Sequence, residues 1–101
     1  MAALDVLADP SRRHIVELVS GGELNASAIA AHFDFSRPAV SQHLAILVDG
    51  GVLDVRRAGT RRYFRLNPAS LTEAGDWLQA QASRWTRVLD ALESALDEGE
   101  I

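Results

Sequence analysis

Hydrophobic residues recur at helical spacing near the start of the chain. Asp9 followed by Pro10 is typical of a helix start, because aspartate caps the first turn and proline tolerates the missing N–H there. Gly21 and Gly22 favour a helix end. The pattern predicts a helix between these signals, with an apolar face of Ile15, Val16, Leu18 and Val19. A shorter helix is expected before it, over residues 2–8.

Two more short helices are expected next, separated by a polar bend at Asp34. Asn25 is expected to cap the first of them and Ser36 the second, in which Pro38 lies early enough to be harmless. The inward face of the first comprises Ile29, Ala30 and Phe33, and the apolar stripe of the second comprises Val40, Leu44, Leu47 and Val48. The sequence therefore predicts two helices that meet at a tight turn.

The periodicity changes after Gly51, where apolar and polar residues begin to alternate. Alternation of this kind is typical of strands, and a glycine between two alternating runs indicates a hairpin. The apolar positions are Leu53 and Val55 in one run and Phe64 and Leu66 in the other, with Ala58, Gly59 and Thr60 between them. The hairpin is strongly basic, because five arginines fall within its residues 56–65: Arg56, Arg57, Arg61, Arg62 and Arg65.

A long helix is expected over residues 67–101, with start signals at Asn67-Pro68 and again at Ser70–Glu73. A heptad seam runs along it, through Leu71, Leu78, Trp85 and Leu92 and, four residues after each, Gly75, Ala82, Leu89 and Leu96. About 28 helical residues would span roughly 40 Å, which is longer than a small domain can cover. We therefore expect the same helix of a second copy to cover it, with an interface of Leu71, Leu78, Trp85, Leu89, Leu92 and Leu96. Trp77 and Trp85 fit dimer packing better than base stacking, because they lie in an acidic region.

Composition limits the remaining possibilities. The 101 residues fit one domain, and the absence of cysteine excludes disulfides and thiolate chemistry. The first residues lack the pattern of a signal peptide and no apolar run is long enough to span a bilayer, so a cytoplasmic protein with no membrane partner is expected. The net charge of −4 is unevenly spread. Residues 1–66 carry eight Arg and seven acids, whereas residues 67–101 carry two Arg and seven acids.

The order of elements is that of a winged helix-turn-helix, in which the second helix of the pair enters the DNA major groove and the hairpin lies on the flanking backbone. Two segments, LADPSRRHIVELV (7–19) and FSRPAVSQHLAILVDGGVLDVRRAGTRRYFRL (35–66), together with the long last helix, resemble the ArsR/SmtB family of dimeric bacterial repressors. The predicted fold is mainly α with a small β-hairpin (α+β), a single winged helix-turn-helix domain over 1–101 with a dimerisation helix over 67–101.

The resemblance implies a sequence-specific, homodimeric repressor of a palindromic operator. The expected DNA contacts are Ser36, Arg37, Pro38, Ser41, Gln42 and Ala45 on the helix, and Arg56, Arg57, Arg61 and Arg62 in the hairpin. Arg37 suits either a base or a phosphate. Relatives often carry lysine where this chain has Ala45, so affinity for the backbone is expected to depend more on the hairpin. Arg12 or Arg13 offers a further phosphate contact.

The metal sites of the family are not expected here. The cysteine pair of arsenic and cadmium sensors corresponds to Asn25 and Ser27, and the last helix has none of the histidines of the zinc and nickel type. Ser41 and His43 lie two apart on a helix and point in different directions, so no enzyme is expected. His43 fits packing at the edge of the buried stripe, and His14 and His32 have no partner at ligand spacing.

No cofactor is predicted, and the sequence does not name an effector. Two alternatives stay open at this point. One is a ligand- or metal-responsive sensor whose site is not recognisable, and the other is a winged helix used only for protein contacts, which the negative net charge would suit. The polar face of the helix and the basic hairpin favour DNA binding over the second alternative.

Overall fold

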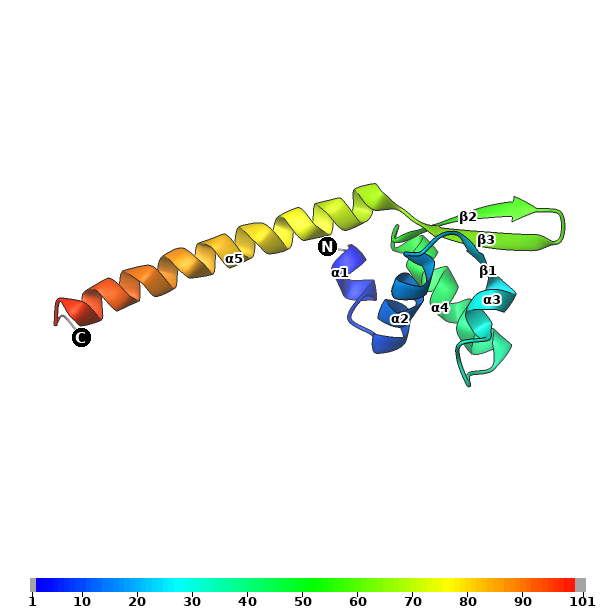
Figure 1. Ribbon diagram of the computed structural model, residues 1–101, viewed down its shortest axis with the longest axis horizontal. Coiled ribbons are helices and arrows are strands. Elements are labelled where there is room, and N and C mark those ends of the chain that lie inside the picture. The colour runs from blue at the N-terminus through cyan, green and yellow to red at the C-terminus, as the bar shows by residue number, and fades with distance from the viewer. Residues whose placement is uncertain (1, 100–101) are drawn as a thin grey trace. The chain divides into compact units, whose positions relative to one another are not determined.

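The computed structural model describes residues 2–99, in which the predicted helices and the predicted hairpin follow in the expected order (Figure 1). The chain divides into two compact units, one ending at Leu71 and the other beginning at Thr72. The elements are α1 (Ala2–Val6), α2 (Pro10–Val19), β1 (Leu24–Asn25), α3 (Ala26–Ala30), α4 (Arg37–Asp49), β2 (Leu53–Ala58), β3 (Arg61–Leu66) and α5 (Pro68–Asp97). The helix α1 is shorter than the predicted 2–8, because the chain turns after Val6.

The helix starts follow the predicted capping residues. Asp9 accepts a hydrogen bond from the backbone N–H of Ser11 at 2.8 Å, and Pro10 is the first residue of α2. Asn25 accepts a hydrogen bond from the N–H of Ala28 at 2.8 Å and caps α3. Each cap satisfies a backbone donor that has no partner inside the helix, which fixes where the helix begins.

The sheet has one strand more than the sequence predicted. In the strand order β1-β3-β2, the hairpin of β2 and β3 pairs antiparallel, and the two-residue strand β1 joins the free edge of β3. The predicted hairpin is confirmed, and its turn contains Gly59 with a positive φ of 63°. A strand of two residues leaves no periodicity to detect, so β1 was missed, although Asn25 was correctly expected to cap the next helix.

The core of the first unit fixes the orientation of α4. Its fully buried side chains come from α2, α3, α4, the segment before β2, and the sheet: Ile15, Ile29, Val40, Leu44, Leu47, Val52, Leu53 and Phe64. Burying an aliphatic or aromatic side chain of this kind contributes roughly 1.5–3 kcal/mol. Because three of these residues lie on one side of α4, the opposite side of that helix must face solvent.

The apolar pattern of the hairpin differs from the prediction at one position. Val55 alternates with Leu53 along β2, yet Leu53 is 1% exposed and Val55 is 42% exposed. Val55 lies one step further towards the hairpin tip, where it lines a pocket of about 190 Å³ between α4 and the sheet. The core therefore ends at Leu53 along this strand.

The last helix, α5, begins at the first of its two predicted start signals. The side chain of Asn67 accepts the N–H of Ser70 at 3.3 Å, and Pro68 is the first helical residue. The second signal, Ser70–Glu73, lies inside the helix. The helix continues for 30 residues to Asp97, and positions 100–101 of the predicted helix lie outside the described residues.

Candidate nucleic-acid interface

The helix α4 buries one face and exposes the other. Val40, Leu44 and Leu47 are 2%, 1% and 0% exposed. The exposed residues of the helix include its first residue, Arg37, and Ser41, Gln42 and Ala45, which follow Arg37 by four, five and eight positions. We call these four residues the exposed face of α4. The structure thus brings together these residues, which the sequence predicted to act together.

Ser36 and Pro38 fix the start of α4. Ser36 is extended, with φ −64° and ψ 155°, and its Oγ accepts the N–H of Ala39 at 3.3 Å. Pro38 lies in the first turn, where it removes no helical hydrogen bond. Both side chains are exposed. The predicted cap is confirmed, and the predicted DNA contacts of these two residues stay predictions.

The hairpin of residues 53–66, which we call the wing, carries arginines on both of its faces, and the pairing of its strands decides which face each one occupies. Arg57 lies directly opposite Arg62, so these two share one face of the hairpin with Leu53 and Phe64. Arg56 and Arg61 lie on the other face, where Arg56 is opposite Tyr63 and its guanidinium lies 4.8 Å from the ring centroid. Alternation along each strand therefore distributes positive charge to both sides of the wing.

Some of these arginines already have carboxylate partners. Arg56 donates a hydrogen bond to Glu23 at 2.6 Å, which raises the pKa of Arg56 and lowers that of Glu23. Arg65 lies 3.9 Å from Asp54. Within residues 2–99, no carboxylate lies within salt-bridge distance of Arg57, Arg61 or Arg62. Of the predicted phosphate contacts in the wing, these three are the ones whose charge is not already paired.

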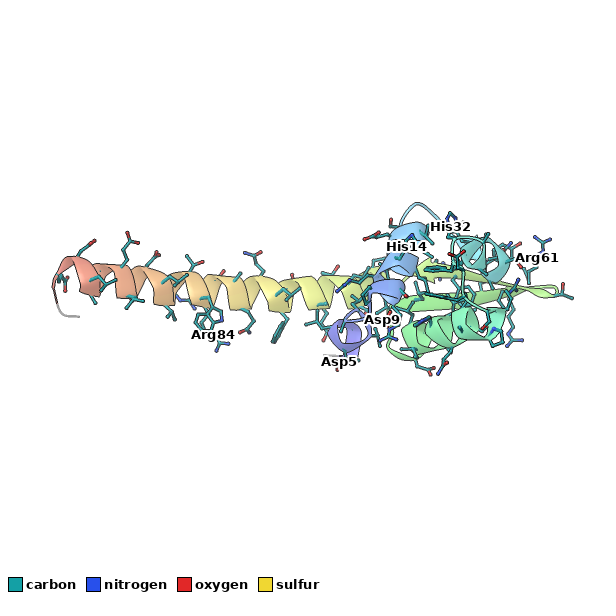
Figure 2. The ribbon with its side chains drawn as sticks, turned by 90° about the horizontal axis from the view of Figure 1, so that it is seen from below. Asp5, Asp9, His14, His32, Arg61 and Arg84 are labelled. Carbon is teal, nitrogen blue, oxygen red and sulfur yellow. The ribbon has the colours of Figure 1, made fainter. Side chains whose placement is uncertain are left out.

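Arg37 lies near the wing tip. It lines a pocket of about 180 Å³ together with Arg61 and Arg62, although it comes from a different element. Figure 2 shows Arg61 projecting from the wing on the side where α3 lies. The structure thus brings one predicted contact of α4 next to two predicted contacts of the wing. Asn25, Ser27 and Thr60 line the same pocket and were not predicted as contacts.

Arg12 and Arg13 have structural partners at the end of α1. The Nε of Arg12 donates to the carbonyl oxygen of Val6 at 2.6 Å, and Arg13 donates to that of Leu7 at 3.5 Å. These bonds satisfy carbonyl groups that a helix end leaves without partners. The structure therefore gives both arginines a role in holding α1, whereas their phosphate contact stays a prediction.

The three histidines occupy packing or surface positions. His43 is half-buried beside Phe35, with ring centroids 6.0 Å apart, and in the described part of the chain its Nδ1 has no hydrogen-bond partner. The ring of His14 lies edge-on to Phe33 at 5.0 Å. His14 and His32 are both exposed. Figure 2 labels His14 on α2 and His32 just after α3. The expectation that His43 packs at the edge of the stripe agrees with this position.

Comparison with known proteins identifies the family. Residues 9–55 match the model of the bacterial regulatory proteins of the arsR family. The chain is 39% identical over 72 residues to the transcriptional repressor SdpR of Bacillus subtilis, covering 71% of this chain and 80% of the relative. It is 40% identical over 100 residues to the HTH-type transcriptional regulator Rv2034 of Mycobacterium tuberculosis, covering 97% of this chain and 90% of the relative. The chain belongs to the ArsR family.

Two solved structures agree with this assignment. The crystal structure of the ArsR family transcriptional regulator RHA00566 is 28% identical, with a TM-score of 0.79 and coverage of 84% of this chain and 93% of that one. The homodimeric winged helix-turn-helix DNA-binding domain Mb0332 of Mycobacterium bovis is 29% identical, with a TM-score of 0.65 and coverage of 81% and 76%. The predicted winged helix-turn-helix fold is confirmed.

Membership of the ArsR family establishes a DNA-binding transcriptional regulator, and it confirms the expectation of a non-enzymatic protein. Between residues 2 and 99, no group of three His, Asp or Glu side chains is placed to hold a metal ion. Over the same span, no helix combines the length and the apolar character needed to cross a membrane.

The C-terminal helix of this ArsR protein exposes a long apolar face. Large hydrophobic side chains stand in solvent along it, and their exposed fractions reach 62% at Trp85 and 60% at Leu89. They are Trp77, Leu78, Trp85, Val88, Leu89, Leu92 and Leu96. Of the six residues predicted to form the dimer interface, all except the half-buried Leu71 are in this exposed set. Their assignment to a dimer interface stays a prediction.

Proposed function

We propose that the protein is a homodimeric transcriptional repressor that binds a two-fold symmetric operator. The observation that carries this proposal is the position of the exposed face of α4 beside the unpaired arginines of the wing. Together they offer hydrogen-bonding groups for base edges and positive charge for phosphates on one surface. The related SdpR is a transcriptional repressor, which supports repression over activation.

In this proposal α4 enters the major groove. Ser41 and Gln42 can donate to and accept from base edges, and glutamine suits the paired donor and acceptor of adenine. Ala45 offers a methyl group that can contact the methyl group of thymine. Ser36 and Pro38 hold the start of the helix close to the backbone. Arg57, Arg61 and Arg62 contact phosphates, and Arg56 contributes to a smaller extent because Glu23 already pairs with it.

The dimer forms through α5 in this proposal. A helix that exposes Trp85, Leu89 and Leu92 in water gains free energy when a second copy covers them. The relative from Mycobacterium bovis is a homodimer of the same fold, which supports the same assembly here. Residues 1–101 then work as one DNA-binding domain in which α5 is the dimerisation element. We also expect a DNA-binding regulator of this kind to act in the cytoplasm, where the bacterial chromosome lies.

A selection from random double-stranded DNA with purified protein tests this function. We expect an enriched sequence made of two inverted half-sites, spaced by about one helical turn of 10–10.5 base pairs or a multiple of it. Sedimentation of the complex should give two chains per duplex. If the selection enriches no sequence, the protein is a winged helix that serves protein contacts. If the enriched site lacks symmetry, the dimeric mode is wrong.

A further inference from the structure

A polar pocket opens where three parts of the first unit meet. Asn25 and Ser27 lie at the junction of β1 and α3, Arg37 is the first residue of α4, and Thr60, Arg61 and Arg62 follow the wing tip. The pocket has a volume of about 180 Å³. It lies beyond the point where β1 stops pairing with β3, because that pairing ends at Tyr63.

The charge of the pocket favours an anion. Three arginines line it and no carboxylate does, although the chain as a whole carries a net charge of −4. Elsewhere in the described residues, Arg12, Arg56 and Arg65 each have an acid within 4.0 Å. Gathering guanidinium groups with no counter-charge is unfavourable, and a bound anion would remove that cost.

The uncharged groups of the pocket can act as donors. Ser27 and Thr60 carry hydroxyl groups. The side-chain oxygen of Asn25 accepts the N–H of Ala28, so its NH2 group keeps two donors for a ligand. A phosphodiester of the DNA backbone presents only acceptors, and arginine can bind it with two parallel hydrogen bonds. The donor set therefore fits a phosphate group.

We propose that this pocket holds one phosphate group of the DNA backbone, with Arg37 and Arg61 as its charged contacts and Ser27 as its hydroxyl donor. This proposal rests on the proposed function and adds to it. It gives Arg37 a phosphate rather than a base, and it makes Ser27 a DNA contact. Because the pocket joins α3, α4 and the wing, one phosphate fixes the depth and register of α4 in the groove.

Methylphosphonate substitution tests the pocket directly. Each phosphate of the selected operator is replaced in turn by an uncharged methylphosphonate, and the affinity of the wild-type protein is measured by fluorescence anisotropy. We expect the substitution to weaken wild-type binding at several phosphates, because the wing also contacts the backbone. One of these in each half-site, where the loss is about tenfold or more as for a hydrogen bond to a charged group, is the phosphate held by the pocket. At that position the same methylphosphonate should weaken DNA binding by the Ser27→Ala and Arg37→Ala variants much less than it weakens binding by the wild type.

The control is Ser20→Ala, a variant of an exposed serine that donates to the carbonyl of Glu17 and lies outside the pocket. At every phosphate, methylphosphonate substitution should weaken DNA binding by this variant as much as it weakens binding by the wild type. If the costs in Ser27→Ala and Arg37→Ala equal those of the wild type at all positions, the pocket holds no backbone phosphate. If the DNA selection has nevertheless enriched a symmetric operator, the proposed function stands and only the inference about the pocket is wrong.

Experiments with inorganic phosphate test whether the anion in the pocket is a DNA backbone phosphate or a free ion. We expect it to weaken DNA binding no more than chloride does at equal ionic strength. Saturable binding of inorganic phosphate below about 1 mM, measured by calorimetry and abolished in Arg37→Ala, would instead indicate a soluble anionic ligand. That result would overturn the assignment to the DNA backbone.

Discussion

The proposed DNA interface contains two kinds of side chain, which differ in whether they can distinguish one base pair from another. The hydroxyl of Ser41 and the amide of Gln42 have directional donors and acceptors, whereas a guanidinium at the wing tip senses any phosphate. Sequence reasoning proposed the first kind because all of them lie on one helix face. It did not propose Ser27, because only the folded chain brings residue 27 near residues 37 and 61.

The first prediction concerns Gln42. Replacing it with alanine should weaken binding to the selected operator by roughly 1–3 kcal/mol, because the variant cannot form the hydrogen bonds to one base pair. Binding to random DNA should stay unchanged, since every phosphate contact is kept. Anisotropy titrations on both DNAs measure the two effects. Equal losses on both would show that the exposed face of α4 does not read bases.

The second prediction concerns the capping carboxylate of Asp9. Backbone hydrogen bonds from Arg12 and Ser11 hold its pKa below the ordinary value of 3.8. Its charged form therefore stabilises the fold fully above that value, and this stabilisation is lost as the pH falls through the lower pKa of the folded state. Asparagine caps helices about as well but does not titrate. The melting temperature of Asp9→Asn should thus fall less than that of the wild type as the pH drops below 3.8. Identical acid profiles would contradict this.

At the scale of elements, the sequence predicted what depends on neighbours along the chain. The caps, the helix periods and the glycine turn of the wing are local signals, and they gave the predicted helices and the hairpin in the right order. Two local signals were wrong: Phe33 lies beyond the end of α3 at Ala30, and the second start signal at Ser70–Glu73 lies inside α5. The strand β1 exists only because Leu24 meets Phe64 across the fold, and Val55 is exposed only because the core ends before it. Such features depend on contacts between residues that are distant in the sequence, and a local sequence pattern does not reveal these contacts.

The third prediction concerns the wing as a hairpin. Arg57 and Arg62 face each other across the strands, and like charges in that position destabilise a hairpin. Arg57→Thr should therefore stabilise the folded protein by roughly 0.2–1 kcal/mol, because threonine also favours strands. It should at the same time weaken binding to operator and random DNA alike. The log–log salt slope should fall by about 0.9 for each phosphate that the variant no longer neutralises.

Thermal melting and salt titrations measure the two effects of Arg57→Thr on one preparation. A matched control is Arg65→Thr, which removes a guanidinium that lies near Asp54 and has no like charge opposite it. This control should not gain stability. If Arg57→Thr binds DNA as the wild type does, the wing face that carries Arg57 does not touch the backbone.

At the scale of the whole molecule, the C-terminal region differs from the rest of the chain in its acidic charge and in the number of hydrophobic side chains that it exposes. The acidic C-terminal region, with seven acids and two arginines over residues 67–101, is a poor partner for DNA. Along α5, polar residues such as Ser83 and Arg87 lie on the side opposite Leu78 and Trp85, as the helical period requires. The helix therefore has one apolar side and one polar side, an arrangement that suits the proposed dimer.

The last prediction tests that assembly. Trp85→Glu places a charge in the middle of the exposed apolar face of α5, and it should convert a dimer at about 10 µM into a monomer. Each monomer then holds only one half-site, so operator affinity should fall by about 100-fold or more. Ser83→Glu adds the same charge on the opposite side and should keep both the dimer and the affinity. Sedimentation velocity and anisotropy measure the two properties, and circular dichroism verifies that both variants are folded. A folded Trp85→Glu that remains dimeric with unchanged operator affinity would mean that α5 is not the dimerisation element.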